Sequence, residues 1–213
     1  LKDEWTITPW LTASAGIRGQ FSTTYDPTML VSAGVVAGLS EKVFFKATYG
    51  EGFRPPDFQS TAVTNGLASG VTYVGNPNLD VERSRSVEVE INASLLENKR
   101  AIRRLYLRAD YAYTRMNSVI TNVGGRFENS GDRDIHSAEF LGNLSFRNGH
   151  ELWLSYYFVD VVDSEQGRLR NIANHIFNAG GKLSFWDDRL TLSSLLTVRG
   201  GMEDLNRAAA LSN

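Results

Sequence analysis

Apolar and polar residues alternate with a period of two along most of the chain, and the 3.6-residue period of helices is nearly absent. In the stretch VEVEINASL, the apolar residues Val87, Val89 and Ile91 alternate with Glu88 and Glu90. Successive side chains of a strand point to opposite faces, so this pattern predicts strands with one apolar and one polar face. We expect about nine strands, over residues 4–22, 29–39, 42–53, 85–96, 103–119, 134–146, 150–163, 171–185 and 189–199.

The expected strands are long, and the links between them alternate in length. Soluble strands usually have about five or six residues, whereas a tilted membrane strand needs about nine to eleven residues to cross the hydrocarbon. Short charged turns (SEK, ENKRAI, RNGH and WDDR) alternate with longer links near 23–28, 54–84, 120–133 and 164–170. In an antiparallel meander this places all short turns at one end, which is typical of outer-membrane barrels with short periplasmic turns.

A soluble β-sandwich or up-and-down barrel would also alternate, with its apolar face inside. Two further features favour a membrane barrel. Aromatic residues gather toward strand ends, as in interfacial girdles: Trp5, Phe146, Trp153, Phe185 and Trp186 near short turns, and Phe21, Tyr49, Tyr111, Tyr113 and Phe158 toward long loops. The polar face carries many charges, namely Arg18, Lys46, Glu88, Glu90, Arg108, Asp110, Glu139 and Lys182. We therefore predict an all-β fold, a transmembrane antiparallel β-barrel with these charges in its lumen, largely paired with one another.

Composition and charge narrow the classes of function further. The formal net charge of −2 gives no reason to expect a nucleic-acid partner, and the absence of cysteine excludes disulfides and thiolate metal sites. His136, His150 and His175 fall on separate expected strands without ligand spacing, so we expect ordinary lumen, interface or turn residues. The sequence has no Gly-x-Ser-x-Gly motif and no phosphate-cradling glycine loop. We expect no enzyme, catalytic residue, metal or cofactor.

Two short motifs flank the longest link. The strand 42–53 ends in Phe53, Arg54, Pro55 and Pro56, and two prolines in succession cannot donate to a β-ladder. The second motif comes about twenty residues later and leads into the next strand; it consists of Asn76, Pro77, Asn78, Leu79, Asp80, Val81 and Glu82. Asn-Pro is a turn former. We expect these motif residues to be structural residues of the loop and rim, with Leu79 packed under the loop and Arg54 or Glu82 in a charge pair.

The two motifs resemble those of TonB-dependent outer-membrane receptors, in which an aromatic-Arg-Ala/Pro-Pro box ends one strand and an Asn-Pro-x-Leu-x-x-Glu box precedes the next. The later stretches FENSGDRDIHSAEF, SYYFVDVVDSEQG and NIANHIF look like family features in the same order. The resemblance implies a barrel of about twenty-two strands with a plugged lumen. Residues 1–213 are then expected to be a fragment of the barrel domain, without the plug domain, the TonB box and the terminal strands.

The resemblance also implies a location and a function. It implies a protein of the bacterial outer membrane whose partners are membrane lipid, the TonB–ExbB–ExbD complex and a small-molecule ligand. We expect active uptake of a scarce nutrient, most simply a ferric siderophore; the alternatives are a passive porin or other large barrel, and uptake of cobalamin or sugars. Residues 57–75 contain no histidine, which argues against haem as the cargo. Tyr73 and Arg54 are the candidate ligand contacts in the loop.

Overall fold

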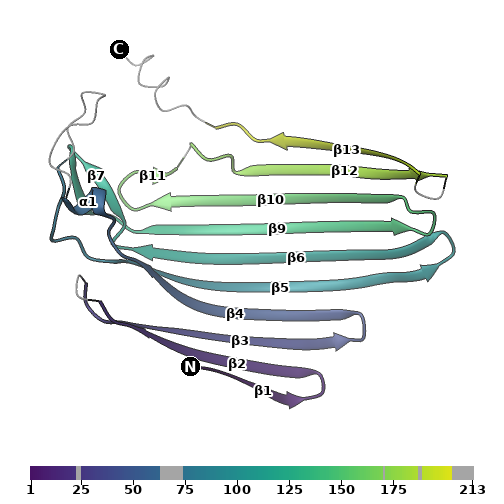
Figure 1. Cartoon of the computed structure of the whole chain (residues 1–213), viewed down its shortest axis with the longest axis horizontal. Coiled ribbons are helices and arrows are strands. Elements are labelled where there is room, and N and C mark those ends of the chain that lie inside the picture. The colour runs from purple at the N-terminus through teal and green to yellow at the C-terminus, as the bar shows by residue number, and fades with distance from the viewer. Residues whose placement is uncertain (23–24, 63–73, 170, 187–188, 203–213) are drawn as a thin grey trace, which may run out of the picture.

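The computed structural model of the chain describes residues 1–22, 25–62, 74–169, 171–186 and 189–202. Most of the described residues belong to one antiparallel sheet whose main path runs β1-β2-β3-β4-β5-β6-β9-β10-β12-β13, with β11 paired to β10 (Figure 1). A separate two-stranded sheet pairs β7 with β8, and one short helix, α1, is also present. The elements are β1 (Lys2–Thr8), β2 (Leu11–Gln20), β3 (Thr28–Ser40), β4 (Val43–Arg54), α1 (Phe58–Ala62), β5 (Glu82–Lys99), β6 (Ile102–Asn117), β7 (Ile120–Val123), β8 (Arg126–Asn129), β9 (Arg133–Phe146), β10 (Glu151–Asp163), β11 (Gly167–Arg168), β12 (His175–Phe185) and β13 (Leu190–Arg199).

The main path has ten strands rather than about nine, because the expected strand 4–22 is a hairpin. The chain turns at Pro9 and Trp10, where Pro9 has no N–H to donate to a ladder. Trp5 pairs with Ala13 and Thr6 with Thr12, so odd-numbered residues pair with odd-numbered residues across the turn and even-numbered with even-numbered. Paired residues share a face of the sheet, and the alternation therefore continues in phase through the turn. This continuity makes a hairpin look like one long strand in the sequence.

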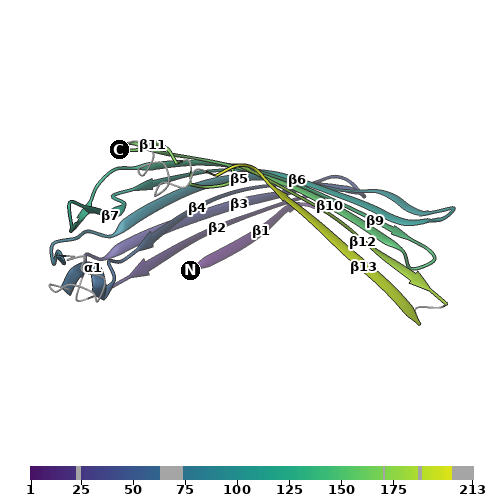
Figure 2. The same cartoon turned by 90° about the horizontal axis from the view of Figure 1, so that it is seen from above.

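The links between strands alternate in length as predicted. In Figure 1 the described short turns lie at the right-hand end of the sheet. The ends of β2, β4, β6 and β10 that lead into the longer links lie at the opposite end. The added turn at Pro9 and Trp10 belongs to the short-turn end as well. Seen at right angles, the sheet is a single curved and twisted layer (Figure 2), as expected of a segment of barrel wall.

The pairing register assigns each side chain to one of the two faces. Lys46 pairs with Glu90, Glu90 with Asp110, and Asp110 with Glu139, so these charges share a face. The same reasoning places all eight charged residues predicted to share a face on this one. On the opposite face the middle of each strand is almost wholly apolar, for example through Ala13, Val35, Ala47, Val89, Tyr111, Ala138 and Phe158.

No layer formed by the described residues covers the apolar face. Large apolar side chains along the strands are strongly exposed, including Ile91, Phe140, Leu152 and Leu196 at 43, 38, 46 and 59%. The buried apolar residues among those described are few: Ala37, Val81, Val119, Val159, Val161 and Ala173. An exposed apolar surface of this extent marks an interaction with another apolar phase. No helix in the described part of the chain is long and apolar enough to span a membrane.

A close packing contact joins β10 and β12 on the charged face. Gly180 pairs with Trp153, and a Cβ atom at Gly180 would lie 2.5 Å from the indole ring. We expect Gly180→Ala to push the indole off the strand and to lower the free energy of unfolding of the full-length protein by about 1–3 kcal/mol. Denaturant titration measures this change. Gly50→Ala is the matched control, since a Cβ there would meet no heavy atom within 4 Å; equal effects of the two substitutions would contradict the packing argument.

Candidate functional site

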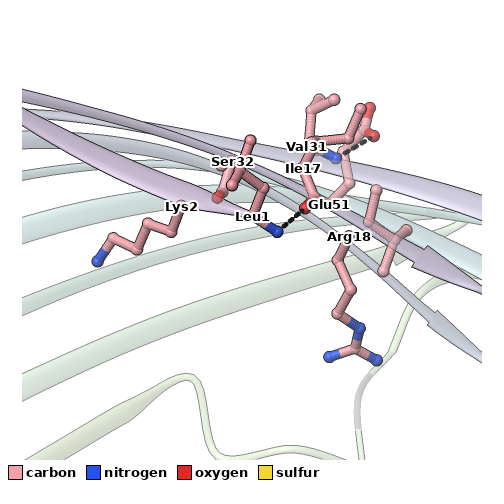
Figure 3. Close-up of a pocket in the computed structure, with 9 residues that line it drawn as sticks. Leu1, Lys2, Ile17, Arg18, Val31, Ser32 and Glu51 are labelled. Atoms are coloured by element: carbon pink, nitrogen blue, oxygen red, sulfur yellow. Dashed lines mark hydrogen bonds between the residues drawn. The ribbon is translucent and has the colours of Figure 1, made fainter.

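A shallow cavity of about 390 Å³ lies at the β1 edge of the sheet (Figure 3). The backbone nitrogen of Leu1 donates to the carbonyl of Ile17 at 2.8 Å, and the amide of Val31 donates to Glu51 at 3.1 Å. Glu51 also accepts a hydrogen bond from the Tyr49 hydroxyl at 2.7 Å. Glu51, the one acid among the described residues that line this cavity, is thus already bonded within the wall. The two motifs form a larger hydrogen-bonded network at the long-loop end.

The two sequence motifs meet at the long-loop end of β4 and β5. Arg54 is the last residue of β4 and Glu82 the first of β5, and they form the last pair of this ladder. Pro55 and Pro56 follow directly and carry the chain away from the sheet. Phe53, one residue before Arg54, packs against the Tyr25 ring of the preceding link, with ring centroids 5.6 Å apart. Both strands extend slightly further toward the loop than the alternation predicted.

Glu82 joins three segments of the chain. Its side chain is only 1% exposed, and one carboxylate oxygen accepts a hydrogen bond and ion pair from Nε of Arg54. The other oxygen accepts from the backbone amide of Ile120, the first residue of β7, at 2.8 Å. A buried carboxylate needs such partners to offset the loss of hydration. Glu82 raises the pKa of Arg54 above its ordinary value through this hydrogen bond.

Asn76 organises the second motif. Its side-chain oxygen accepts from the amide of Asn78 at 3.0 Å, which closes an Asx turn around Pro77. The side-chain amide of Asn76 donates to the carbonyl of Phe127 at 3.0 Å, and its backbone amide donates to the carbonyl of Ser60 at 2.8 Å. One asparagine therefore connects the turn to α1 and to β8.

Leu79 and Gly75 lie on either side of this turn. Leu79 is half-buried and lines a polar cavity of about 570 Å³ together with Tyr25 and Arg83. A Cβ atom at Gly75 would lie 2.8 Å from the backbone of Thr61 and Ala62, so only glycine allows the motif to approach α1 this closely.

Asp57 caps the helix that follows the first motif. Its carboxylate accepts from the backbone amide of Ser60 at 2.6 Å, as an N-cap residue does. The amide and then the hydroxyl of Ser60 hold the pKa of Asp57 below its usual range. Residues 63–73, including the candidate ligand contact Tyr73, lie outside the described residues.

The β7–β8 hairpin supplies partners that the motifs alone did not indicate. Asn129 at the end of β8 accepts from the amide of Asp80 at 2.8 Å and donates to the carbonyls of Asp80 and Ser118 at 3.0 and 2.8 Å. The hairpin turns through Gly124 and Gly125, both with positive φ. A Gly-Gly pair is a preferred two-residue hairpin turn, and Gly124 and Gly125 are the sequence signal for this element within the polar link 120–133.

The charges of the polar face are paired within the wall. Lys46 lies 3.6 Å from Glu88, and Arg108 lies 2.6 Å from Glu139 and 3.4 Å from Asp110. These contacts confirm the predicted internal pairing for Lys46 and Arg108. Arg18, also on this face, donates to Gln20 at 2.9 Å.

The three histidines are separate from one another. The hydroxyls of Tyr111 and Tyr156 lie 2.7 and 2.8 Å from Nδ1 of His136 and His175, and His150 accepts from the amide of Ser184 at 3.1 Å. Each ring is thus bonded to its own neighbour. Within the described ranges, no group of three or more histidine, aspartate or glutamate residues is arranged to hold a metal ion.

Comparisons with known proteins agree with the fold. A chain in the structure of the FpvAI–pyocin S2 complex superposes with a TM-score of 0.66 and 14% sequence identity, over 91% of this chain and 27% of that chain. This similarity shows the fold, and the present chain spans about a quarter of the matched one. No curated protein sequence matches. The family model for the TonB-dependent receptor-like β-barrel matches residues 1–208, and its members are proteins of the bacterial outer membrane. With this match over nearly its whole length, the chain belongs to the TonB-dependent receptor-like β-barrel family.

Proposed function

We propose that the chain is part of the barrel wall of a receptor that takes up a scarce nutrient across the outer membrane with energy from the TonB–ExbB–ExbD complex. The observation that carries the proposal is the organised long-loop end, where Glu82 connects both motifs to the β7–β8 hairpin. The family match supports a receptor rather than an enzyme.

The proposed cargo is a ferric siderophore. The matched complex contains FpvAI, and that complex has a pyocin as the second component; the matched chain shares the barrel fold of this chain. Residues 57–75 contain no histidine, so the loop between the motifs lacks an imidazole that could bind haem iron. Cobalamin and sugars are the competing cargoes, and a passive porin is the competing function.

Uptake by the full-length receptor tests this proposal. A strain that lacks the receptor gene should lose growth under iron limitation with one siderophore of a panel, and the full-length gene should restore it. Deletion of tonB should abolish the restored uptake of the same radiolabelled ferric siderophore. Uptake that continues without TonB would indicate a porin. Growth indifferent to every siderophore but dependent on cobalamin or a sugar would replace the proposed cargo.

A further inference from the structure

The polar cavity of about 570 Å³ at the long-loop end lies on the outer side of the wall. Phe53 and Arg83 form a pair of the β4–β5 ladder and have the parity of Tyr49 and Val87, which belong to the apolar face. Tyr25 packs on Phe53 and lines the cavity together with Arg83. The cavity is therefore on the side of the wall that contacts lipid, and not on the lumen side where a cargo passes.

The cavity lies beyond the hydrocarbon of the bilayer. Arg83 is four residues further toward the loops than Val87, the last apolar residue of β5 on this face. Four strand residues span about 13 Å, or roughly 9–11 Å along the membrane normal at the usual strand tilt. Between them, Arg85 pairs with Glu51 and Arg115 in a row of charged residues. Since a headgroup layer is about 5–8 Å thick, this row lies at headgroup level and the cavity at or beyond its outer edge.

The cavity lining offers hydrogen-bond donors and acceptors that no other described residue uses. Four exposed side chains of the lining form no hydrogen bond or ion pair within the described part of the chain: Asp26, Asn78, Asp80 and Arg83. They stand beside the ring of Tyr25, whose hydroxyl is held by the side-chain amide of Gln20 at 2.9 Å. The lining therefore combines two carboxylates, an amide and a guanidinium with one aromatic ring.

The backbone that carries these polar groups is fixed by other contacts. The amide and carbonyl of Asp80 are both bonded to the side chain of Asn129, at 2.8 and 3.0 Å. The amide of Asn78 donates to the side chain of Asn76 at 3.0 Å, and Arg83 belongs to the β5 ladder. None of these contacts uses the polar atoms of the lining side chains, so the cavity is ordered before a ligand binds, which lowers the entropic cost of binding.

The charge of the lining favours a neutral ligand rich in hydroxyl groups. Asp26 and Asp80 repel an anion such as phosphate, and Arg83 repels a cation. Residues 23–24 and 63–73 lie outside the described residues but include no acidic or basic residue, so this balance of charges does not depend on them. A hydroxyl group both donates and accepts, and can therefore bind to the carboxylates and the guanidinium at once.

We propose that this cavity binds a neutral saccharide at the outer surface of the membrane. The carboxylates of Asp26 and Asp80 accept from sugar hydroxyls, and Arg83 and Asn78 donate to sugar oxygens. The ring of Tyr25 packs against the C–H face of a sugar ring. Because the cavity is on the outer side of the wall, this inference does not rest on the proposed nutrient uptake.

Saccharide binding by the purified full-length receptor tests the proposal. An array of neutral oligosaccharides of glucose, galactose, mannose and N-acetylglucosamine is screened, and the best one is titrated by calorimetry. We expect Asp80→Asn and Arg83→Gln each to weaken its binding roughly tenfold, the effect of one lost hydrogen bond to a charged group. Tighter binding of a diacylglycerol that carries the same sugar would support the cavity with a glycolipid as its source, and equal binding would support it with a soluble saccharide.

Arg85→Gln is the matched control. Arg85 lies two residues from Arg83 on the same strand and face, but it faces Glu51 at 3.6 Å and does not line the cavity. Its substitution should change saccharide binding less than about twofold. Equal losses for Arg83→Gln and Arg85→Gln would overturn the proposal, as would failure of every saccharide to bind or displacement of the sugar by phosphatidylglycerol vesicles. Unchanged hydrogen exchange at the Ile120 amide verifies that the long-loop end of each variant is folded.

Discussion

Val89→Arg is expected to lower the free energy of unfolding of the full-length receptor by about 2–4 kcal/mol, the cost of an arginine on the lipid face near the bilayer midplane. Val89 lies midway along β5, between Ala47 and Tyr111 of the neighbouring strands, and is 37% exposed on the apolar face. A guanidinium there has only apolar neighbours and must reach a headgroup to be solvated. Urea titration in phospholipid vesicles measures the change.

Thr48→Arg provides the matched control for this substitution. Thr48 lies next to Ala47 on β4 but on the charged face, where it pairs with Glu88. A cation there meets an acid and the wet interior of the barrel, so we expect a change below about 1 kcal/mol. If the two arginines destabilise the protein equally, the assignment of the two faces to lipid and lumen is wrong.

Glu82→Ala is expected to loosen the long-loop end while leaving the strands folded. The substitution leaves the Ile120 amide without its acceptor and removes the partner of Arg54. A hydrogen bond to a charged acceptor contributes about 1.5–3 kcal/mol. The Arg54 side chain is 71% exposed, so solvent screens its part of the interaction. We therefore expect most of the effect at Ile120, as an amide exchange rate raised by at least roughly tenfold.

Two further variants separate the contributions to this effect. Glu82→Gln keeps an oxygen for the Ile120 amide but removes the charge, so its effect should be smaller than that of Glu82→Ala. Glu88→Ala removes another acid of β5, one that faces Lys46 on the lumen side with both side chains 40% exposed, and should leave exchange at Ile120 unchanged. Hydrogen exchange of the full-length receptor measures all three. An unchanged Ile120 amide in Glu82→Ala would show that Glu82 does not hold the loop.

Much of the architecture could be predicted from alternation alone, but the hairpin at Pro9 and Trp10 and the β7–β8 hairpin could not. The alternation correctly predicted where the short and long links lie. It also correctly placed the eight charged residues on one face of the sheet. The alternation did not predict the hairpin at Pro9 and Trp10. Odd-numbered residues pair with odd-numbered residues across that turn, so the pattern shows no break. Pro9, which has no N–H to donate to a ladder, is the sequence signal for this turn.

The candidate site was predictable only as two separate motifs. Arg54 and Glu82 stand out in the sequence because prolines and an Asn-Pro pair flank them. No feature of the sequence near Glu82 indicates that the Ile120 amide donates to its carboxylate. Likewise, no nearby feature indicates that Asn129 hydrogen-bonds to the backbone of Asp80, 49 residues away. These contacts require the β7–β8 hairpin to fold back over the second motif.

The sequence by itself determined the fold class, the alternation of faces and the end of the sheet at which the loops lie. These properties depend on neighbours one or two residues apart, because a strand sends successive side chains to opposite faces. The tertiary structure alone decided how the loops are joined at Glu82 and how Tyr25, Asp80 and Arg83 meet in one cavity. Such contacts join residues that are distant along the chain, and only the register of the completed sheet brings them within reach of one another.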